Sequence, residues 1–159
     1  MSPVKLFQIE EPDGSPAEAN LPGAAIGVDA SGALAEAAFA VGGNAILLRD
    51  HAEFARILPV PAATAPESDW RALFEGVRLR AERLLARPVT HAVVVLAAPP
   101  ARAGAMLRAA AAQAGIEILG LPIAAHLSGE DGPALAAALI AEDLMPRPGT
   151  ESTDTAYFC

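Results

Sequence analysis

The pattern of apolar and polar positions predicts one long amphipathic helix near the middle of the chain. After Glu67, apolar residues recur at intervals of three and four positions, the spacing that places side chains on one helix face. Thr64 stands three positions before Glu67, as in a capping box, so we expect Thr64 to begin this helix. Pro88 is expected to end it. The predicted buried stripe consists of Trp70, Leu73, Phe74, Val77, Ala81, Leu84 and Leu85.

Before this helix, three short apolar runs predict an antiparallel meander. Residues 24–29 form the first run and residues 33–41 the second, although the alanines of the second run also fit a helix. Gly42-Gly43-Asn44 is typical of a tight hairpin turn, and residues 45–49 are then the third strand.

After the long helix, strands and helices alternate, which predicts a parallel crossover. Residues 92–97 are a continuous apolar run, as expected of a strand covered on both faces. Pro99 and Pro100 end this run, and an alanine-rich helix follows over residues 101–114. Residues 116–119 are the next strand, so the order is that of a right-handed βαβ unit.

A short helix over residues 122–127 and a final helix over residues 132–144 complete the predicted order. This order is that of a ribonuclease-H-like α/β domain, whose mixed sheet has an antiparallel meander, a parallel βαβ unit and flanking helices. We predict one such domain over residues 23–145, with an N-terminal extension over 1–22 and a flexible tail over 146–159. The expected inward residues of the final helix are Leu135, Leu139, Ile140 and Leu144.

Composition and charge narrow the classes of function. Apolar residues make up 53% of the chain and aromatic residues only 4%. Much of the apolar content is alanine, so we expect helices to approach their neighbours closely. The net charge of −8, with only 11 Lys and Arg residues, opposes binding of nucleic acid. Neither a membrane span nor a signal peptide is predicted, so a cytoplasmic protein without a membrane partner is expected.

Several stretches resemble the first lobe of the Hsp70 nucleotide-binding domain, an actin-like ATPase. Gly27-Val28-Asp29 stands where the family has Gly-Ile-Asp before its first phosphate loop. Residues 84–95, LLARPVTHAVVV, are similar to the family's segment in which a long helix ends and a Thr-Asp-Ala-Val strand begins. Residues 92–118 align with the strand–helix–strand that follows, and residues 122–127, PIAAHL, with a proline-containing helix start. The similarity covers residues 24–128.

The resemblance implies a nucleotide site at the end of the first strand. By this analogy, Asp29 would hold a water of Mg²⁺ beside ATP, and Ser31 and Gly32 would lie in the remnant of the phosphate loop. The same residues also fit a local turn in which Asp29 caps Ser31 and Gly32 without any ligand.

The chain departs from the family pattern at most catalytic positions. The family's Gly-Thr-Thr loop is Ala30-Ser31-Gly32-Ala33 here, and its catalytic glutamate has no counterpart in Gly120-Leu121-Pro122. The second lobe, with its phosphate loop and adenosine pocket, has no counterpart in this sequence. Because phosphoryl transfer depends on positioning of metal and oxyanions, one aspartate cannot supply it.

The C-terminus and the histidines carry further candidate chemistry. Tyr157 and Phe158 are candidates for an aromatic anchor that docks in a partner's groove. Cys159 is a candidate exposed thiol for a disulfide, a thiol partner or a modification, or it is incidental. The three histidines are spread along the sequence without the pairing of metal ligands, which favours surface or packing roles and predicts no metal site.

Three functions follow from these observations. The first is a non-catalytic, Hsp70-like chaperone relative, a pseudoenzyme that acts as a protein-interaction or assembly module, as a homo-oligomer or with a protein partner. The second is a residual ATP-binding half-domain, which completes its nucleotide site by dimerisation or with a partner carrying the second lobe. The third is a small-molecule sensor, or a subunit of a larger enzyme complex, with an apolar pocket. Whether the chain is an enzyme, an ATPase if so, stays open at this stage.

Overall fold

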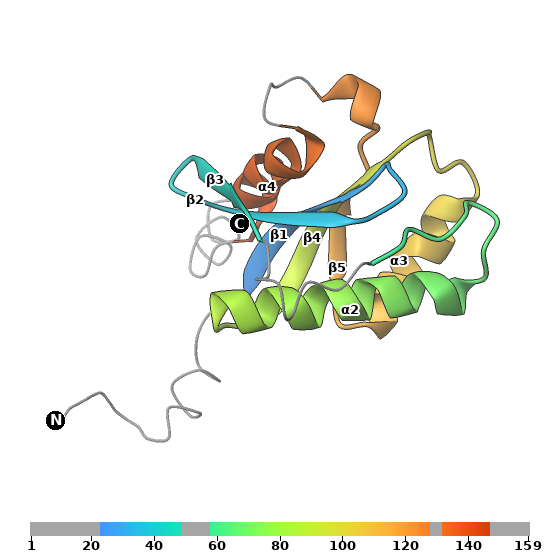
Figure 1. Cartoon of the computed structure of the whole chain (residues 1–159), viewed down its shortest axis with the longest axis horizontal. Coiled ribbons are helices and arrows are strands. Elements are labelled where there is room, and N and C mark those ends of the chain that lie inside the picture. The colour runs from blue at the N-terminus through green and yellow to red at the C-terminus, as the bar shows by residue number, and fades with distance from the viewer. Residues whose placement is uncertain (1–22, 49–57, 128–131, 147–159) are drawn as a thin grey trace, which may run out of the picture.

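The computed structural model describes residues 23–48, 58–127 and 132–146, which form helices around a five-stranded sheet (Figure 1). The predicted extension over residues 1–22 lies outside the described residues, as does the tail beyond Pro146. The strands are β1 (Ala24–Ala30), β2 (Glu36–Val41), β3 (Asn44–Leu47), β4 (Val89–Leu96) and β5 (Glu117–Gly120). The helices are α2 (Glu67–Leu85), α3 (Ala103–Gln113), the 3-10 helix η2 (Ala124–His126) and α4 (Pro133–Leu144).

The sheet combines antiparallel and parallel pairing, as the sequence predicts. Its strand order is β3-β2-β1-β4-β5. β2 is antiparallel to both β1 and β3, whereas β4 is parallel to both β1 and β5. β1 is therefore the central strand, in which Ile26 faces Phe39 of β2 on one side and Ala92 of β4 on the other. The predicted meander and the parallel strand–helix–strand unit are both confirmed at this level.

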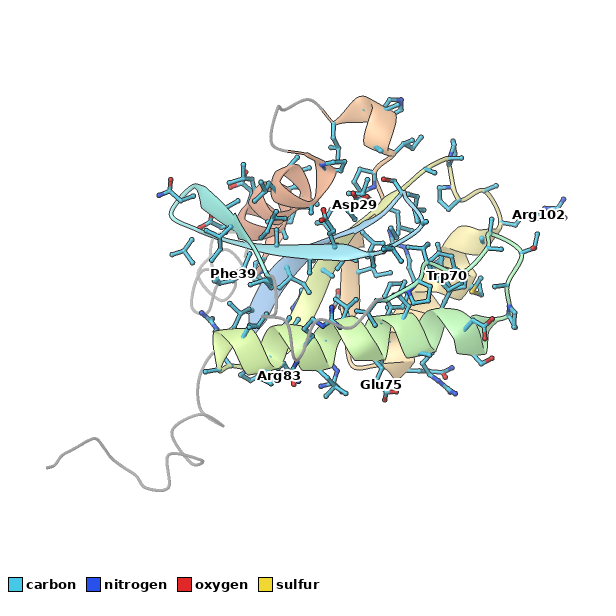
Figure 2. The ribbon with its side chains drawn as sticks, in the orientation of Figure 1. Asp29, Phe39, Trp70, Glu75, Arg83 and Arg102 are labelled. Carbon is cyan, nitrogen blue, oxygen red and sulfur yellow. The ribbon has the colours of Figure 1, made fainter. Side chains whose placement is uncertain are left out.

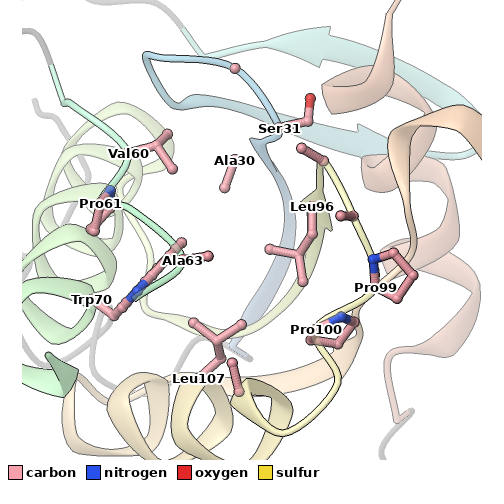
Figure 3. Close-up of a pocket in the computed structure, with 14 residues that line it drawn as sticks. Ala30, Ser31, Val60, Pro61, Ala63, Trp70, Leu96, Pro99, Pro100 and Leu107 are labelled. Atoms are coloured by element: carbon pink, nitrogen blue, oxygen red, sulfur yellow. The ribbon is translucent and has the colours of Figure 1, made fainter. Parts of the chain in front are cut away.

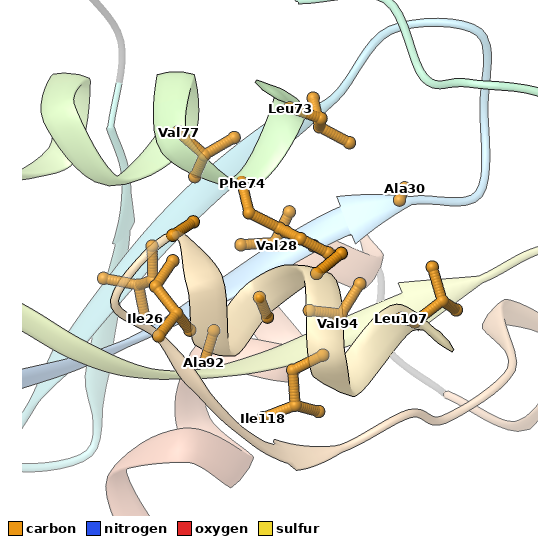
Figure 4. Packing of buried hydrophobic residues seen from close by; sticks show 14 of the residues in the cluster. Ile26, Val28, Ala30, Leu73, Phe74, Val77, Ala92, Val94, Leu107 and Ile118 are labelled. Carbon is orange, nitrogen blue, oxygen red and sulfur yellow. The ribbon is translucent and has the colours of Figure 1, made fainter. Parts of the chain in front are cut away.

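Helices cover both faces of the central strands. On one face, Ile26 and Val28 of β1 pack with Phe74 of α2, Val94 of β4 and Leu107 of α3 (Figure 4). On the opposite face, the side chains that alternate with them pack against α4. This two-sided burial explains why β1 and β4 are almost wholly apolar.

The final helix packs mainly through its alanines, so the predicted inward face is wrong for Leu139 and Leu144, whereas Leu135 and Ile140 are partly buried against the core clusters. α4 buries Ala134, Ala137, Ala138 and Ala141 against the sheet. Leu139 is 38% exposed and Leu144 is 50% exposed. The helix backbone lies so close to Gly27 of β1 that a Cβ there would overlap the backbone nitrogen of Ala138 and stand 2.7 Å from the carbonyl oxygen of Ala134. A leucine face would hold the helix farther from the sheet.

The start of α2 also differs from the prediction. The helix begins at Glu67 rather than at Thr64, and Pro66 occupies the N-cap position without a side-chain cap. The residue before a proline avoids the helical conformation, so Pro66 prevents Ala65 from joining the first turn. The predicted stripe is otherwise buried over Trp70 to Ala81, whereas Leu84 is 40% exposed.

Candidate functional site

The carboxyl ends of β1 and β4 lie side by side at one edge of the sheet. Asp29 is level with Val95, and Ala30 with Leu96, the last residue of β4. After β1 the chain continues to β2, towards one lateral edge of the sheet. After β4 it continues through α3 to β5, at the other lateral edge. Ligands of open α/β sheets bind outside the carboxyl ends of strands at such a divergence. This edge is therefore the first candidate site.

A pocket of about 280 Å³ opens at this edge (Figure 3). Its walls come from the end of β1 and the loop after it, from residues 60–63, from the start of α2, and from the end of β4 with the loop into α3. Its main apolar wall residues are Ala30, Trp70, Leu96, Pro99, Pro100 and Leu107. None of the lining residues is Asp, Glu, His, Lys or Arg.

The predicted nucleotide residues form a local turn, part of which borders this pocket. Ser31 and Gly32 line the pocket. Oδ1 of Asp29 accepts two hydrogen bonds from Ser31, one from its backbone N–H at 2.9 Å and one from its hydroxyl at 2.5 Å. This is the ligand-free turn that the sequence offers as the alternative. A Cβ at Gly32 would have no atom within 4 Å, so packing does not require glycine there.

Trp70 is the residue of this site that the sequence places only in the core. Its side chain lines the pocket and packs against Phe74, with ring centroids 6.1 Å apart. Trp70 is 4% exposed. Its Nε1 is buried without a hydrogen-bond partner among the described residues, although buried polar groups nearly always have one. A helical stripe shows that Trp70 is inward but does not show what its indole faces.

A second candidate region is an apolar surface on the β2–β3 hairpin. Ala38 and Ala40 pack against α4, so the alternating residues Phe39 and Val41 face the other side of the sheet. Ile46 lies opposite Phe39 in the register and shares its side. Val41 is 61% exposed and Ile46 is 60% exposed. We call Phe39, Val41 and Ile46 the hairpin surface; Figure 2 labels Phe39.

The hairpin is held by α4 and by a basic side chain. The carboxylate of Glu142 accepts hydrogen bonds from the backbone N–H groups of Gly42, at 2.5 Å, and Gly43, at 3.0 Å. Both glycines have positive φ, 59° and 85°, which glycine adopts at little cost. The guanidinium carbon of Arg87 stands 5.8 Å from the ring centre of Phe39. The hairpin surface therefore has a defined position relative to the body of the domain.

The two described histidines do not gather enough carboxylates to form a metal site. Nδ1 of His91 is 2.7 Å from the hydroxyl of Thr90, and its Nε2 is 3.5 Å from Oε1 of Glu117. His126 ends η2, and His51 lies outside the described residues. Within the described part of the chain, no group of three or more His, Cys, Asp or Glu residues has the arrangement of a metal site.

No protein-family model matches this chain, and no curated protein matches it. The resemblance to Hsp70 therefore stays a prediction.

Tyr157, Phe158 and Cys159 lie outside the described residues, so the predicted aromatic anchor and terminal thiol also stay predictions. Among the helices of residues 23–48, 58–127 and 132–146, none combines the length and hydropathy needed to cross a membrane.

Proposed function

We propose that this chain is a non-catalytic, ribonuclease-H-like module of the Hsp70 first-lobe type, and that it binds protein through the hairpin surface. The strand order β3-β2-β1-β4-β5, with β2 antiparallel to its neighbours, supports the fold part of this proposal. Such a module needs a mixed sheet, with the antiparallel meander at one edge and the parallel strands at the other.

The exposure of Val41 and Ile46 carries the binding part of the proposal. Because Val41 is two positions from Phe39, the cross-strand partner of Ile46, the two exposed side chains are diagonal neighbours on one sheet face. Burying apolar area contributes about 25 cal/mol per Å², so two large aliphatic residues on an anchored hairpin favour association. Clustered exposed apolar residues, rimmed by polar groups, are typical of protein-binding surfaces.

The chemistry at the β1–β4 edge supports a non-catalytic role. Asp29 accepts two hydrogen bonds from Ser31 in its own turn, and no ionisable side chain lines the adjacent pocket among the described residues. Catalysis of group transfer requires several preorganised polar groups aimed at the reacting atoms. One aspartate in a local turn beside an apolar pocket does not meet that requirement.

Two matched variants test the proposed surface. Val41→Thr/Ile46→Lys makes the hairpin surface polar, whereas Leu139→Lys places the same charge on α4, which packs on the opposite face of the sheet. Masses are measured by light scattering at micromolar concentration, and tagged full chains are recovered from the native source. We expect the wild type and Leu139→Lys to self-associate or to retain one stoichiometric partner, and the double variant to lose that association.

Two outcomes would contradict this proposal. A wild-type chain that is monomeric and retains no stoichiometric protein argues against a binding module. Association that the double variant leaves intact argues against the hairpin surface. Circular dichroism of each variant identifies any loss that arises from unfolding.

The residual ATP-binding half-domain is the second candidate function. It is favoured by the position of Asp29 at the carboxyl end of β1, with Ser31 and Gly32 at the pocket mouth. Calorimetry with Mg²⁺-ATP tests it, alone and with any partner recovered above. Heat of binding that Asp29→Ala abolishes supports this candidate, and absence of heat with ATP, ADP and GTP contradicts it.

A further inference from the structure

We propose that the pocket at the β1–β4 edge is a site for a small, uncharged, largely apolar molecule that carries one hydrogen-bond acceptor, such as a ring ketone. This inference goes beyond protein binding, because the hairpin surface lies on β2 and β3 and contributes no residue to the pocket. The ligand site can therefore be confirmed or refuted independently of the proposed protein-binding function.

The size of the pocket limits the ligand. The cavity measures about 280 Å³. Since an apolar cavity of about 150 Å³ accepts benzene, this pocket suits a body of about ten non-hydrogen atoms. Such a molecule corresponds to one fused ring pair rather than to a nucleotide.

The lining excludes charged ligands from the interior. The described walls contain no ionisable side chain, so a phosphate or carboxylate would lose its hydration without compensation. Pro99 and Pro100 add no backbone N–H to the wall that they form. The loop that contains them forms a hydrogen-bonded turn. Ala101 has φ 50°, a left-handed conformation rare for alanine, and the N–H of Ala103 donates to the carbonyl of Pro100 at 2.8 Å.

Trp70 indicates the single polar feature of the ligand. Its Nε1–H can only donate, is buried and has no acceptor among the described residues. Trp70 also contributes to the pocket wall (Figure 3). An acceptor on the ligand would satisfy this donor, which requires that the indole turn its N–H edge to the cavity. The rest of the ligand contacts Leu96, Leu107 and the prolines.

Two probes of nearly equal shape test the proposal on the full chain. 1-Indanone carries one carbonyl acceptor, and indane lacks it. Because the chain contains a single tryptophan, its indole Nε1–H gives one resonance in a ¹⁵N-correlated spectrum, and its fluorescence reports on the pocket. We expect 1-indanone to bind at least about fivefold more tightly than indane, from one net hydrogen bond, and to move the indole resonance downfield.

Three variants separate the parts of the proposal. Trp70→Phe keeps a ring and removes the N–H, so both probes should bind equally, as measured by ligand-observed NMR. Ala103→Leu fills the pocket and should abolish binding of both probes, whereas Ala105→Leu, at an exposed position on the same helix, should not.

If neither probe perturbs Trp70 up to its solubility limit, the site is refuted. A 1-indanone preference that survives in Trp70→Phe refutes the role of the indole.

Discussion

The backbone of Ala138 lies directly against Gly27, so that a single added carbon atom on Gly27 would overlap it. This contact joins the middle of the central strand to the middle of the last helix. Backbone-to-backbone packing of this kind requires small residues on both sides. The alanine face of α4 and the glycine of β1 are therefore parts of one feature.

Replacement of Gly27 by alanine should destabilise the fold strongly. The new methyl group would collide with backbone atoms of α4, which cannot move away as a flexible side chain does. We expect a loss of about 3 kcal/mol in the free energy of unfolding, at the upper end of typical overpacking, measured by urea denaturation. Gly32→Ala is the matched control, because its Cβ would meet no atom within 4 Å, and it should change stability by less than ~0.5 kcal/mol.

Substitutions on α4 should follow the alanine face rather than the leucine pattern. Ala138 is fully buried, whereas Leu139 is 38% exposed. Ala138→Leu should cost about 1–3 kcal/mol through overpacking, and Leu139→Ala should cost less than about 1 kcal/mol. Thermal unfolding of the two variants gives this order directly. The reverse order would show that the helix turns its leucines inward.

Removal of the Glu142 carboxylate should loosen the hairpin turn. The backbone N–H groups of Gly42 and Gly43 lose their acceptor in Glu142→Ala. Because the bonded region is exposed, we expect a modest cost of about 1 kcal/mol and faster hydrogen exchange at both glycine amides. Asp143→Ala, at an exposed neighbouring position, serves as control. Unchanged exchange in Glu142→Ala would mean that the carboxylate does not hold the turn.

Arg78 and Glu82 should act as one unit that joins α2 to two other elements. Nε of Arg78 donates to the carbonyl oxygen of Ala114 at 2.6 Å, and its Nη1 stands 3.1 Å from Oε1 of Glu82. Oε2 of Glu82 accepts from the backbone N–H of Val89 at 2.9 Å. In a double-mutant cycle, the single changes to alanine should each cost about 1 kcal/mol, with a coupling of about 0.5 kcal/mol or more. Strict additivity would contradict a shared network.

The sequence predicts elements well where one local signal dominates. The apolar run that forms β4 and the two glycines of the hairpin turn each have one physical interpretation. The α2 stripe is buried as expected over Trp70 to Ala81. At the start of α2, two local signals compete, and the backbone restriction of Pro66 overrides the cap offered by Thr64.

Features that arise from two distant segments escape such prediction. The leucines of α4 are more hydrophobic than its alanines, so periodicity alone places Leu139 and Leu144 inward and misses the alanine face. The deciding fact is the glycine at position 27, more than a hundred residues earlier in the printed sequence. The pocket is a similar case, because its walls come from several segments and no single motif marks Trp70 as part of it.

The hydrogen bond that the backbone N–H of Gly42 donates to Glu142 spans 100 positions along the chain, and this separation has a consequence for biosynthesis. During translation the hairpin is made about a hundred residues before the carboxylate that fastens it and before α4, which covers the reverse side of β1. Long-range contacts of this kind slow folding, because a large loop must close before they form. The face of β1 that α4 covers therefore stays exposed in the nascent chain until α4 has been synthesised.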